Sequence, residues 1–236
     1  MSTERPILSL VTGSWNRATE LRRLIQSIEE HTPVEWELII SDASDSNYPY
    51  SVPRQVRILI ERPKLTCVQG FNRAFREARG KYCLFLNDDA TVLPHYAVEA
   101  IAFMEAHPQI GLGALYYAQI KPPFKVCEYW DMVYANFGII SRELGNQIGW
   151  FDDSLSMYGN DNSLAFRVLL AGKGIGSIPG ARVWHHAVPD AQKIANQVYR
   201  NPDADTLRRK YGYALGRMRR VYEKTANLAW PLIIGE

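Results

Sequence analysis

The chain has 236 residues, of which 47% are hydrophobic and 22% are charged, so it can bury the core of one sizeable domain or of two small ones. Its net charge of +2 gives no strong nucleic-acid signal, and its three scattered cysteines predict neither a disulfide framework nor a zinc knuckle. The amino-terminal residues lack the apolar stretch of a signal peptide, and no run approaches the roughly 18 apolar residues of a membrane span, so we expect a cytoplasmic protein.

The first half of the chain alternates short apolar runs with segments of helical periodicity. The apolar runs predict five strands, at residues 7–11, 36–41, 56–60, 81–86 and 111–117. The periodic segments predict three helices, the first capped by Asn16 and ending at His31, the others at residues 68–79 and 94–106. Because strands that alternate with helices need crossover connections, we expect an α/β fold with a mostly parallel sheet and helices on both faces.

The second half is less regular. Residues 137–144 have the composition of a strand that leads into a turn. Apolar residues at helical spacing between 164 and 169 predict a helix that ends at Gly172. Residues 178–188 predict a short strand that ends on two histidines, and from about residue 203 the abundance of lysine and arginine predicts a basic helix.

Polar side chains follow the predicted strands, at the edge where parallel sheets bind their ligands. Thr12 follows the first strand, Asp42 the second, and Asn87, Asp88 and Asp89 the fourth. The adjacent carboxylates of Asp88 and Asp89 repel each other and resist burial. Either they form a turn in water or cap the next helix, or a bound cation holds them, and the residues by themselves leave both interpretations open.

Five segments of the chain fall into a familiar order and spacing, at residues 12–28, 38–45, 71–94, 137–174 and 180–186. Together they resemble a nucleotide-sugar glycosyltransferase of the GT-A fold, in the large family-2 group. The resemblance covers about residues 6–188. It implies a Rossmann-like, mostly parallel central sheet flanked by helices, with a C-terminal helical tail.

The resemblance also implies a domain organisation. A glycosyltransferase domain would cover residues 1–202, with a nucleotide-sugar-binding half at about 1–115 and an acceptor-binding half at about 116–202. A basic helical extension would follow at 203–236. We expect this extension to cover the core or to join two copies of the chain, and peripheral contact with the inner face of a membrane is the alternative.

The donor side of the site is implied by matching positions. Asn87, Asp88 and Asp89 stand where the family has its D-x-D motif, so that Asp88 would lie near the ribose and Asp89 would bind the metal. Asp42 would bind the nucleotide base near Thr12, and His185 would complete the metal or diphosphate site. The nucleotide-sugar-binding residues expected on this basis are Thr12, Asn16, Asp42, Arg73, Asn87 and Asp88.

The acceptor side is implied in the same way. Asp161 stands at the position of the family's catalytic base, although it could equally be the N-cap of the helix that follows. Trp150, Phe151 and Asp152 line an acceptor pocket or belong to the core. The sequence departs from the family pattern at Asn87, which replaces the first acid of D-x-D.

The expected function is a metal-dependent, inverting glycosyltransferase. It would move a sugar from a nucleotide-diphosphate donor of UDP, GDP or dTDP type to an unknown acceptor hydroxyl. A Mn²⁺ or Mg²⁺ ion would stabilise the leaving diphosphate, and an imidazole ligand would favour Mn²⁺. The alternatives are a non-catalytic module that binds nucleotide sugars or carbohydrates, and a sugar nucleotidyltransferase, whose glycine-rich phosphate loop is not apparent in the single-glycine segment 12–21.

Overall fold

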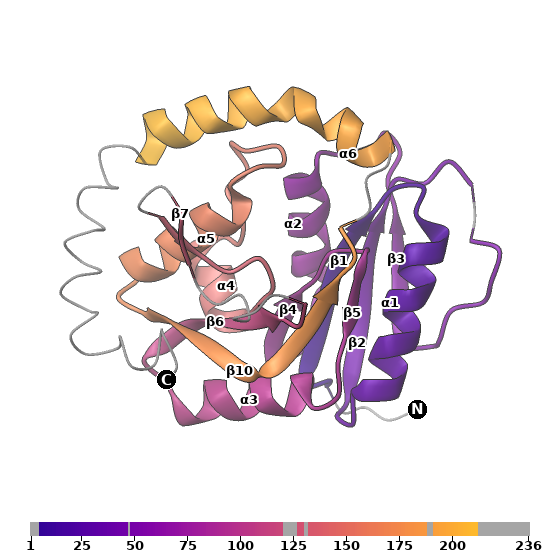
Figure 1. Ribbon diagram of the computed structural model, residues 1–236, viewed down its shortest axis with the longest axis horizontal. Helices are drawn as coiled ribbons and strands as arrows, with labels where there is room; N and C mark the ends of the chain where they lie inside the picture. Colours follow the sequence, from indigo (N-terminus) through magenta and orange to yellow (C-terminus); the bar gives the residue numbers. More distant parts are fainter. Residues whose placement is uncertain (1–4, 47, 120–126, 130–131, 188–190, 212–236) are drawn as a thin grey trace.

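The computed structural model describes residues 5–46, 48–119, 127–129, 132–187 and 191–211. Its centre is an eight-stranded mixed sheet in the order β3-β2-β1-β4-β9-β6-β10-β5, flanked by helices (Figure 1). A separate two-stranded sheet pairs β7 with β8. The α/β fold with a central sheet that is largely parallel is confirmed, and three antiparallel pairings, β4 with β9, β9 with β6 and β10 with β5, interrupt it.

The first half of the chain matches the predicted alternation closely. Strands β1, β2 and β3 are parallel neighbours, and β4 joins β1 on its other side. The strand bounds are β1 Leu8–Ser14, β2 Trp36–Asp42, β3 Val56–Ile60, β4 Tyr82–Phe85 and β6 Ile110–Tyr117. The helix bounds are α1 Ala18–His31, α2 Cys67–Glu77 and α3 Tyr96–Ala106.

The second half contains elements that the sequence did not predict. Local signals missed β5 (Ala90–Val92) and the hairpin of β7 (Cys127–Tyr129) and β8 (Met132–Tyr134), because each strand has only three residues. The segment predicted as a strand and turn is β9 (Gly138–Ser141) followed at once by a helix, α4 (Arg142–Ile148). The Ser141 side chain starts α4 by accepting the N–H of Leu144 at 3.2 Å, and Gly149 ends it with a φ of +78°.

Two further elements complete the domain. Helix α5 (Asn160–Leu170) lies where a helix was predicted. Strand β10 (Gly174–His185) begins earlier than the predicted 178 and pairs with β6 at residues 174–178 and 182–183, with an irregularity between them. Gly176 fits this pairing because a Cβ atom there would approach the Phe103 ring to 2.5 Å.

Two apolar cores lie on opposite faces of the sheet. Helices α1 and α3 cover one face, with Leu21, Leu24 and Tyr96 fully buried against it. Helices α2, α4 and α5 cover the other face, where Phe75 and Phe166 are among the largest buried side chains. Burial on both faces explains why the strands are continuous apolar runs rather than alternating ones.

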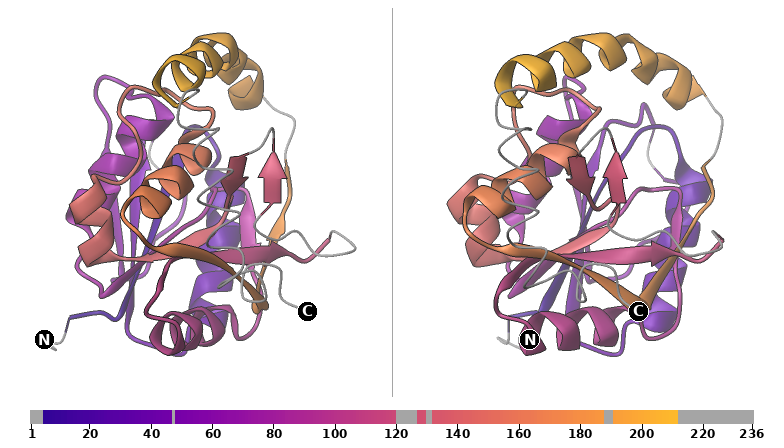
Figure 2. Two further views of the ribbon diagram at one scale, coloured as in Figure 1. Left: turned by 90° about the vertical axis from the view of Figure 1, so that its left-hand side faces the viewer. Right: turned by 60° about the vertical axis from the view of Figure 1, so that its left-hand side comes forward.

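A helical segment crosses the molecule above the carboxyl ends of β1 and β2 (Figures 1 and 2). It consists of α6 (Ala191–Asn196), the 3₁₀ turn η1 (Gln197–Tyr199) and helical residues 200–211. No helix within the described ranges is long and apolar enough to span a lipid bilayer.

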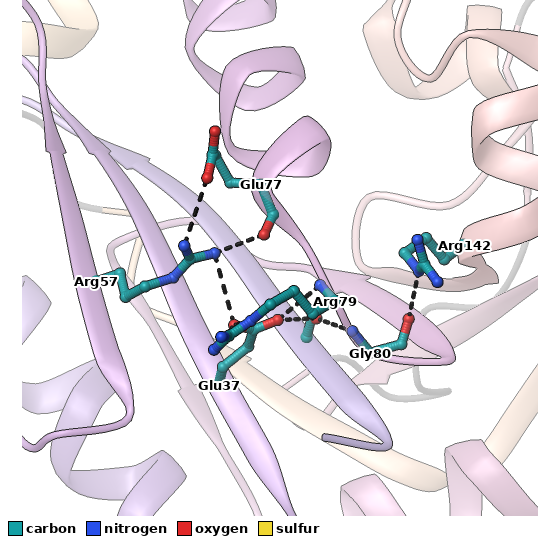
Figure 3. A network of polar contacts seen from close by, with 7 residues as sticks. Glu37, Arg57, Glu77, Arg79, Gly80 and Arg142 are labelled. Atoms are coloured by element: carbon teal, nitrogen blue, oxygen red, sulfur yellow. Dashed lines mark hydrogen bonds and ion pairs between the residues drawn. The ribbon is translucent and has the colours of Figure 1, made fainter. Parts of the chain in front are cut away.

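A polar network around the buried carboxylate of Glu37 ties α2 to the amino ends of the strands (Figure 3). Glu37 of β2 accepts hydrogen bonds from the Ser9 hydroxyl at 2.7 Å and from the Arg79 backbone and guanidinium at 2.7–3.0 Å. Arg57 of β3 lies 3.6 Å from the same carboxylate and also contacts Glu77. The network fixes the end of the sheet that faces away from the polar strand ends.

Candidate active site

The acid cluster after β4 is buried and paired. The Asp88 carboxylate is 3% exposed and accepts hydrogen bonds from Ser14 Oγ at 3.0 Å and from Arg17 Nη1 at 2.8 Å. Asp89 Oδ1 lies 3.1 Å from His185 Nε2, and Asp89 Oδ2 lies 3.5 Å from Arg17 Nη1. Asp88 and Asp89 do form a turn, but it is buried and not in water. The helix-cap alternative is wrong, because α3 begins without a side-chain cap.

The short strand β5 explains why His185 reaches Asp89. β5 runs antiparallel to the end of β10, with Ala90 opposite His185. The Asp89 carbonyl accepts the N–H of His186 at 2.9 Å, which extends this pairing by one step. The His185 ring stacks on Tyr117 with 5.7 Å between centroids, so its orientation is fixed.

Burial raises the pKa of Asp88 to about 6. The Arg17 charge and hydrogen bond oppose this rise, and the charge of Asp89 adds to it. Two neighbouring buried carboxylates are stable in their ionised forms only if positive charge lies close to them. Arg17 supplies part of this charge.

These residues form the wall of a cavity of about 200 Å³. From the strand ends it is lined by Gly13, Arg17, Asn87, Asp88, Asp89 and His185. From the covering segments it is lined by Cys67, Phe71, Met157, Tyr158, Ala187, Gln192, Lys193 and Asn196. The structure therefore brings together the predicted D-x-D residues and the predicted histidine.

A second, smaller cavity of about 60 Å³ adjoins the first over the carboxyl ends of β1 and β2. The two cavities share the residues Gly13, Cys67, Phe71, Gln192 and Asn196. Helix α6 thus covers both cavities through Gln192 and Asn196. The sequence did not predict this, because no local motif marks the segment.

Asp42 lies beside the smaller cavity. Its carboxylate is 2% exposed and accepts hydrogen bonds from the backbone N–H and the hydroxyl of Ser44, at 3.0 and 2.6 Å. Its neighbours Ser41 and Ala43 line the cavity. The Thr12 side chain is fully buried, and the next residue, Gly13, lines both cavities instead.

Asn16 is not the cap of α1. It has a φ of +55°, and Arg17 occupies the N-cap position without a side-chain cap bond. The Asn16 amide instead pairs with Asp45, donating to its carboxylate at 2.7 Å and accepting its N–H at 2.9 Å. Asn16 therefore clamps the loop after β1 to the loop after β2.

Three residues that line the smaller cavity were not among the predicted site residues. Lys64 places its ammonium 2.9 Å from the centroid of the Trp15 ring, and both line the cavity. Glu61, directly after β3, accepts the Ser41 hydroxyl at 2.7 Å and the N–H of Leu65 at 2.9 Å. The rule that strand ends carry the site would have identified Glu61, which directly follows β3.

Arg73 has a different position from the one expected. Its guanidinium donates to the carbonyl oxygen of Ile60 at 2.7 Å, at the end of β3. It is not among the described residues that line either cavity. The contact holds the end of β3 against α2.

Two of the three expected acceptor residues belong to the core. Trp150 is 4% exposed and stacks on Phe75 with 4.3 Å between centroids. Phe151 is 2% exposed and packs edge-on against Phe71, Phe75 and Phe85. The core alternative therefore holds for both.

Asp152 is also buried and anchors the C-terminal helix. Its carboxylate accepts hydrogen bonds from Lys210 Nζ at 2.7 Å and from the Tyr211 hydroxyl. Burial would raise the pKa of Asp152, but these bonds and those from Ser154 hold it well below its ordinary value. These contacts hold residues 210 and 211 against the loop after Phe151, and the acceptor-binding role of Asp152 stays a prediction.

Asp161 lies in the first turn of α5, three residues after the lining residue Tyr158. The N-cap alternative is wrong, because the N-cap is Gly159, with a φ of +75°. Asp161 Oδ1 accepts the N–H of Asn162 at 2.8 Å, and burial raises the pKa of the carboxyl group to about 6. Its charge contributes to raising the pKa of Cys67, which lines both cavities.

The loop before Asp161 is held from outside. The Asp203 carboxylate is 2% exposed and accepts the backbone N–H groups of Ser156, Met157 and Tyr158, at 2.9, 2.8 and 2.8 Å. The boundary expected at 202/203 falls within the helical residues 200–211, and Asp203 packs against the domain. The rest of the expected extension, 212–236, lies outside the described residues.

The donor set on the cavity wall fits a divalent cation. Asp89 offers a carboxylate oxygen and His185 an imidazole nitrogen, 3.1 Å apart. Within the described ranges, no cluster of three or more His, Cys, Asp and Glu side chains forms a closed metal cage. A pair of protein ligands is sufficient for a cation that keeps water and phosphate oxygens in its shell, and imidazole suits Mn²⁺ better than Mg²⁺.

Comparison with known proteins identifies the family. The model of "Glycosyl transferase family 2" matches residues 9–152, more than half of the chain. An uncharacterized glycosyltransferase of Haemophilus influenzae is 27% identical over 110 residues, which are 44% of this chain and 37% of that protein. The O-antigen biosynthesis protein RfbC of Myxococcus xanthus is 28% identical over 120 residues, 47% of this chain and 9% of that protein. The chain thus spans well under half the length of these relatives.

Solved structures share the fold. The mannosyltransferase PcManGT from Pyrobaculum calidifontis, in complex with GDP-Man and Mn²⁺, has a TM-score of 0.67 at 19% identity, over 86% of this chain and 63% of that one. GalNAc-T7 with UDP, GalNAc and Mn²⁺ has a TM-score of 0.66 at 14% identity, over 79% of this chain and 45% of that one. The strand order, the acid cluster and the matching family model agree, and the chain belongs to glycosyl transferase family 2.

Proposed function

We propose that the chain transfers a sugar from a nucleotide-diphosphate sugar to an acceptor hydroxyl, with a divalent cation and with inversion at the sugar. The observation that carries the proposal is the cavity wall at the carboxyl ends of the strands, where Asp88, Asp89 and His185 meet. The structural relatives named with GDP-Man or UDP and with Mn²⁺ support it, since they share this fold.

The two cavities suit the two ends of such a donor. We assign the nucleoside to the side of the smaller cavity, next to Asp42, and the diphosphate and sugar to the side of the larger one. Asp89 and His185 would hold the cation, which when bound neutralises the negative charge of the departing diphosphate. Asp88 orients this wall through its bonds to Ser14 and Arg17.

Asp161 is the proposed base. Its raised pKa of about 6 leaves it ionised at neutral pH, yet more basic than an ordinary aspartate. It would accept the proton of the acceptor hydroxyl as that oxygen attacks the sugar from the side opposite the diphosphate. One displacement inverts the anomeric centre, so no second catalytic carboxylate is needed.

Thermal unfolding tests donor binding. The melting temperature is measured with UDP, GDP and dTDP, each with Mn²⁺ and with EDTA. A ligand that binds only the folded state raises the melting temperature by mass action. A Mn²⁺-dependent rise with one nucleotide is expected and identifies the base, whereas no rise with any of them contradicts a donor site.

A non-catalytic nucleotide-sugar-binding module is the second candidate. The observation in its favour is that Asp161 is not among the described residues lining either cavity. The variant Asp161→Asn separates the two functions. Lost turnover with retained nucleotide binding supports the enzyme, and turnover that is unaffected removes Asp161 from the role of base.

A further inference from the structure

Arg17 occupies an unusual place in the site. It is 8% exposed, at the N-cap of α1, and its guanidinium lies 2.8 Å from Asp88 Oδ1 and 3.5 Å from Asp89 Oδ2. It also lines the larger cavity, together with both aspartates and His185. The protein's own cation thus sits against the carboxylate proposed to bind a metal ion.

A guanidinium in this position acts on a metal ion and on a diphosphate with opposite sign. It is always protonated in proteins, so it repels a cation bound to the neighbouring Asp89 carboxylate. Its planar fork of N–H donors matches the geometry of phosphate oxygens, so it attracts a diphosphate in the same cavity. Burial makes both effects larger than they would be in water.

The ion cluster around Glu37 offers a contrast to Arg17. Arg57 and Arg79 neutralise Glu37 in the same way, but neither is among the described residues that line the cavities. Arg17 instead faces the larger cavity directly. A residue that served only to neutralise Asp88 would not need to form part of the cavity wall.

We propose that Arg17 is a diphosphate-binding residue that also weakens binding of the cation alone, so that cation and nucleotide enter the site together. In the free protein Arg17 balances the charge of Asp88 and Asp89. When donor is present, the negative charge of the diphosphate adds to that of Asp88 and Asp89 and offsets the repulsion between Arg17 and the cation. This inference rests on the proposed function.

The test compares Arg17→Gln with Arg22→Gln. Arg22 is exposed on the same helix, so the control removes the same charge away from the cavity. Mn²⁺ affinity without nucleotide is measured from the free-ion signal in electron paramagnetic resonance. Affinity for the nucleoside diphosphate that stabilises the wild type is measured by calorimetry, in Mn²⁺ and in EDTA.

The two affinities are expected to move in opposite directions. Arg17→Gln should bind Mn²⁺ alone about tenfold more tightly and the nucleotide in EDTA about tenfold more weakly, within the usual range of coupling between sites. Arg22→Gln should change neither. A distortion of the site would weaken both affinities together, so equal losses or no change would overturn the proposal.

Nucleotide binding by the wild type distinguishes a failure of the proposed function from a failure of the proposed role of Arg17. If no nucleoside diphosphate binds the wild type under any condition, the donor site itself is wrong and this inference falls with it. If the wild type binds one and Arg17→Gln does not show opposite shifts, only the role of Arg17 is wrong.

Arg17→Gln leaves Asp88 buried beside a neutral partner, which costs stability. The double variant Arg17→Gln/Asp88→Asn removes both charges, and it should retain Mn²⁺ binding through Asp89 and His185 while losing nucleotide affinity in EDTA. Should neither variant fold, the wild type itself decides, since the proposal requires nucleoside diphosphate to raise Mn²⁺ affinity at least about fivefold. Equal Mn²⁺ affinities with and without nucleotide would overturn it.

Discussion

Two buried acid clusters lie at opposite ends of one sheet. At the amino ends, the carboxylate of Glu37 accepts hydrogen bonds from Ser9 and Arg79 and lines neither of the two cavities described above (Figure 3). At the carboxyl ends, Asp88 and Asp89 face a cavity of about 200 Å³ and share Arg17. Burial alone therefore does not mark a carboxylate as part of a site, since Glu37 is as buried as Asp88 and Asp89 but only the latter two border the larger cavity.

The largest expected effect comes from Asp89→Asn. The change removes a charge from the proposed cation pair, so turnover should fall by about 100- to 1,000-fold, as when transition-state charge stabilisation is lost elsewhere. The melting temperature should change little, because the amide removes like-charge repulsion with Asp88. Release of nucleoside diphosphate from the donor measures the rate. Near-normal turnover would mean that the carboxyl-end cluster is structural like the other one.

Glu37→Gln should show the reverse pattern. The amide would place N–H groups against the donors of Ser9 or Arg79, which costs about 2 kcal/mol in free energy of unfolding. The folded fraction should keep its turnover. Urea denaturation and the donor assay measure the two quantities on one sample. A variant that loses activity without losing stability would erase the difference between the clusters.

Asp203→Asn tests the carboxylate that holds the loop before Asp161. The amide cannot accept all three N–H groups of the loop at Ser156, Met157 and Tyr158, so the loop should open more often. Hydrogen exchange of those amides should accelerate by about tenfold, since one lost buried hydrogen bond costs about 1 kcal/mol. Turnover should fall as well.

The matched control for Asp203→Asn is Asp205→Asn. Asp205 lies two residues away on the same helix, is exposed, and pairs with Arg208 at the surface. Exchange of the loop amides should stay at the wild-type rate in this control. Faster exchange in both variants would assign the effect to the helix as a whole and not to the Asp203 contact.

The smallest expected effect is a pH dependence. The pKa of Asp161 is raised to about 6 in the folded protein, above the roughly 3.9 of an unfolded chain, so the folded state binds more protons in between. Its contribution to stability is therefore full below about pH 4 and declines as the pH rises through about 6. Asp161→Asn should flatten this part of the stability curve, measured by urea denaturation between pH 4 and 7. An unchanged slope would contradict the raised pKa.

Sequence reasoning could predict the half of the site that follows strands. Asp42, Asp88, Asp89 and His185 each stand at or just after a strand, and the carboxyl ends of parallel strands share one edge. The same logic did not extend to Arg17, because Asn16 is the better N-cap by residue type. Only the structure excludes Asn16 as the N-cap, through its positive φ and its pairing with Asp45.

The remaining features depend on contacts between distant segments. Trp150 and Phe151 could stack on a sugar or fill the core, and only packing against Phe75 decides it. Asp203 contacts a loop about 46 residues earlier, a separation at which no local pattern carries information. Helix α4 was missed because the apolar run before it is strand-like and the Ser141 cap starts the helix at once.

Cys67 lines both cavities, and the pKa of its thiol depends on the negative charges around the site. Burial first, and then the charges of Asp88, Glu61, Asp161 and Asp203, raise the pKa of its thiol to about 12. Such a thiol is almost wholly protonated at neutral pH, so it should react slowly with alkylating reagents and mild oxidants. A bound cation would offset these negative charges, so the rate at which Cys67 is alkylated should rise. The alkylation rate of this thiol can therefore report occupancy of the cation site.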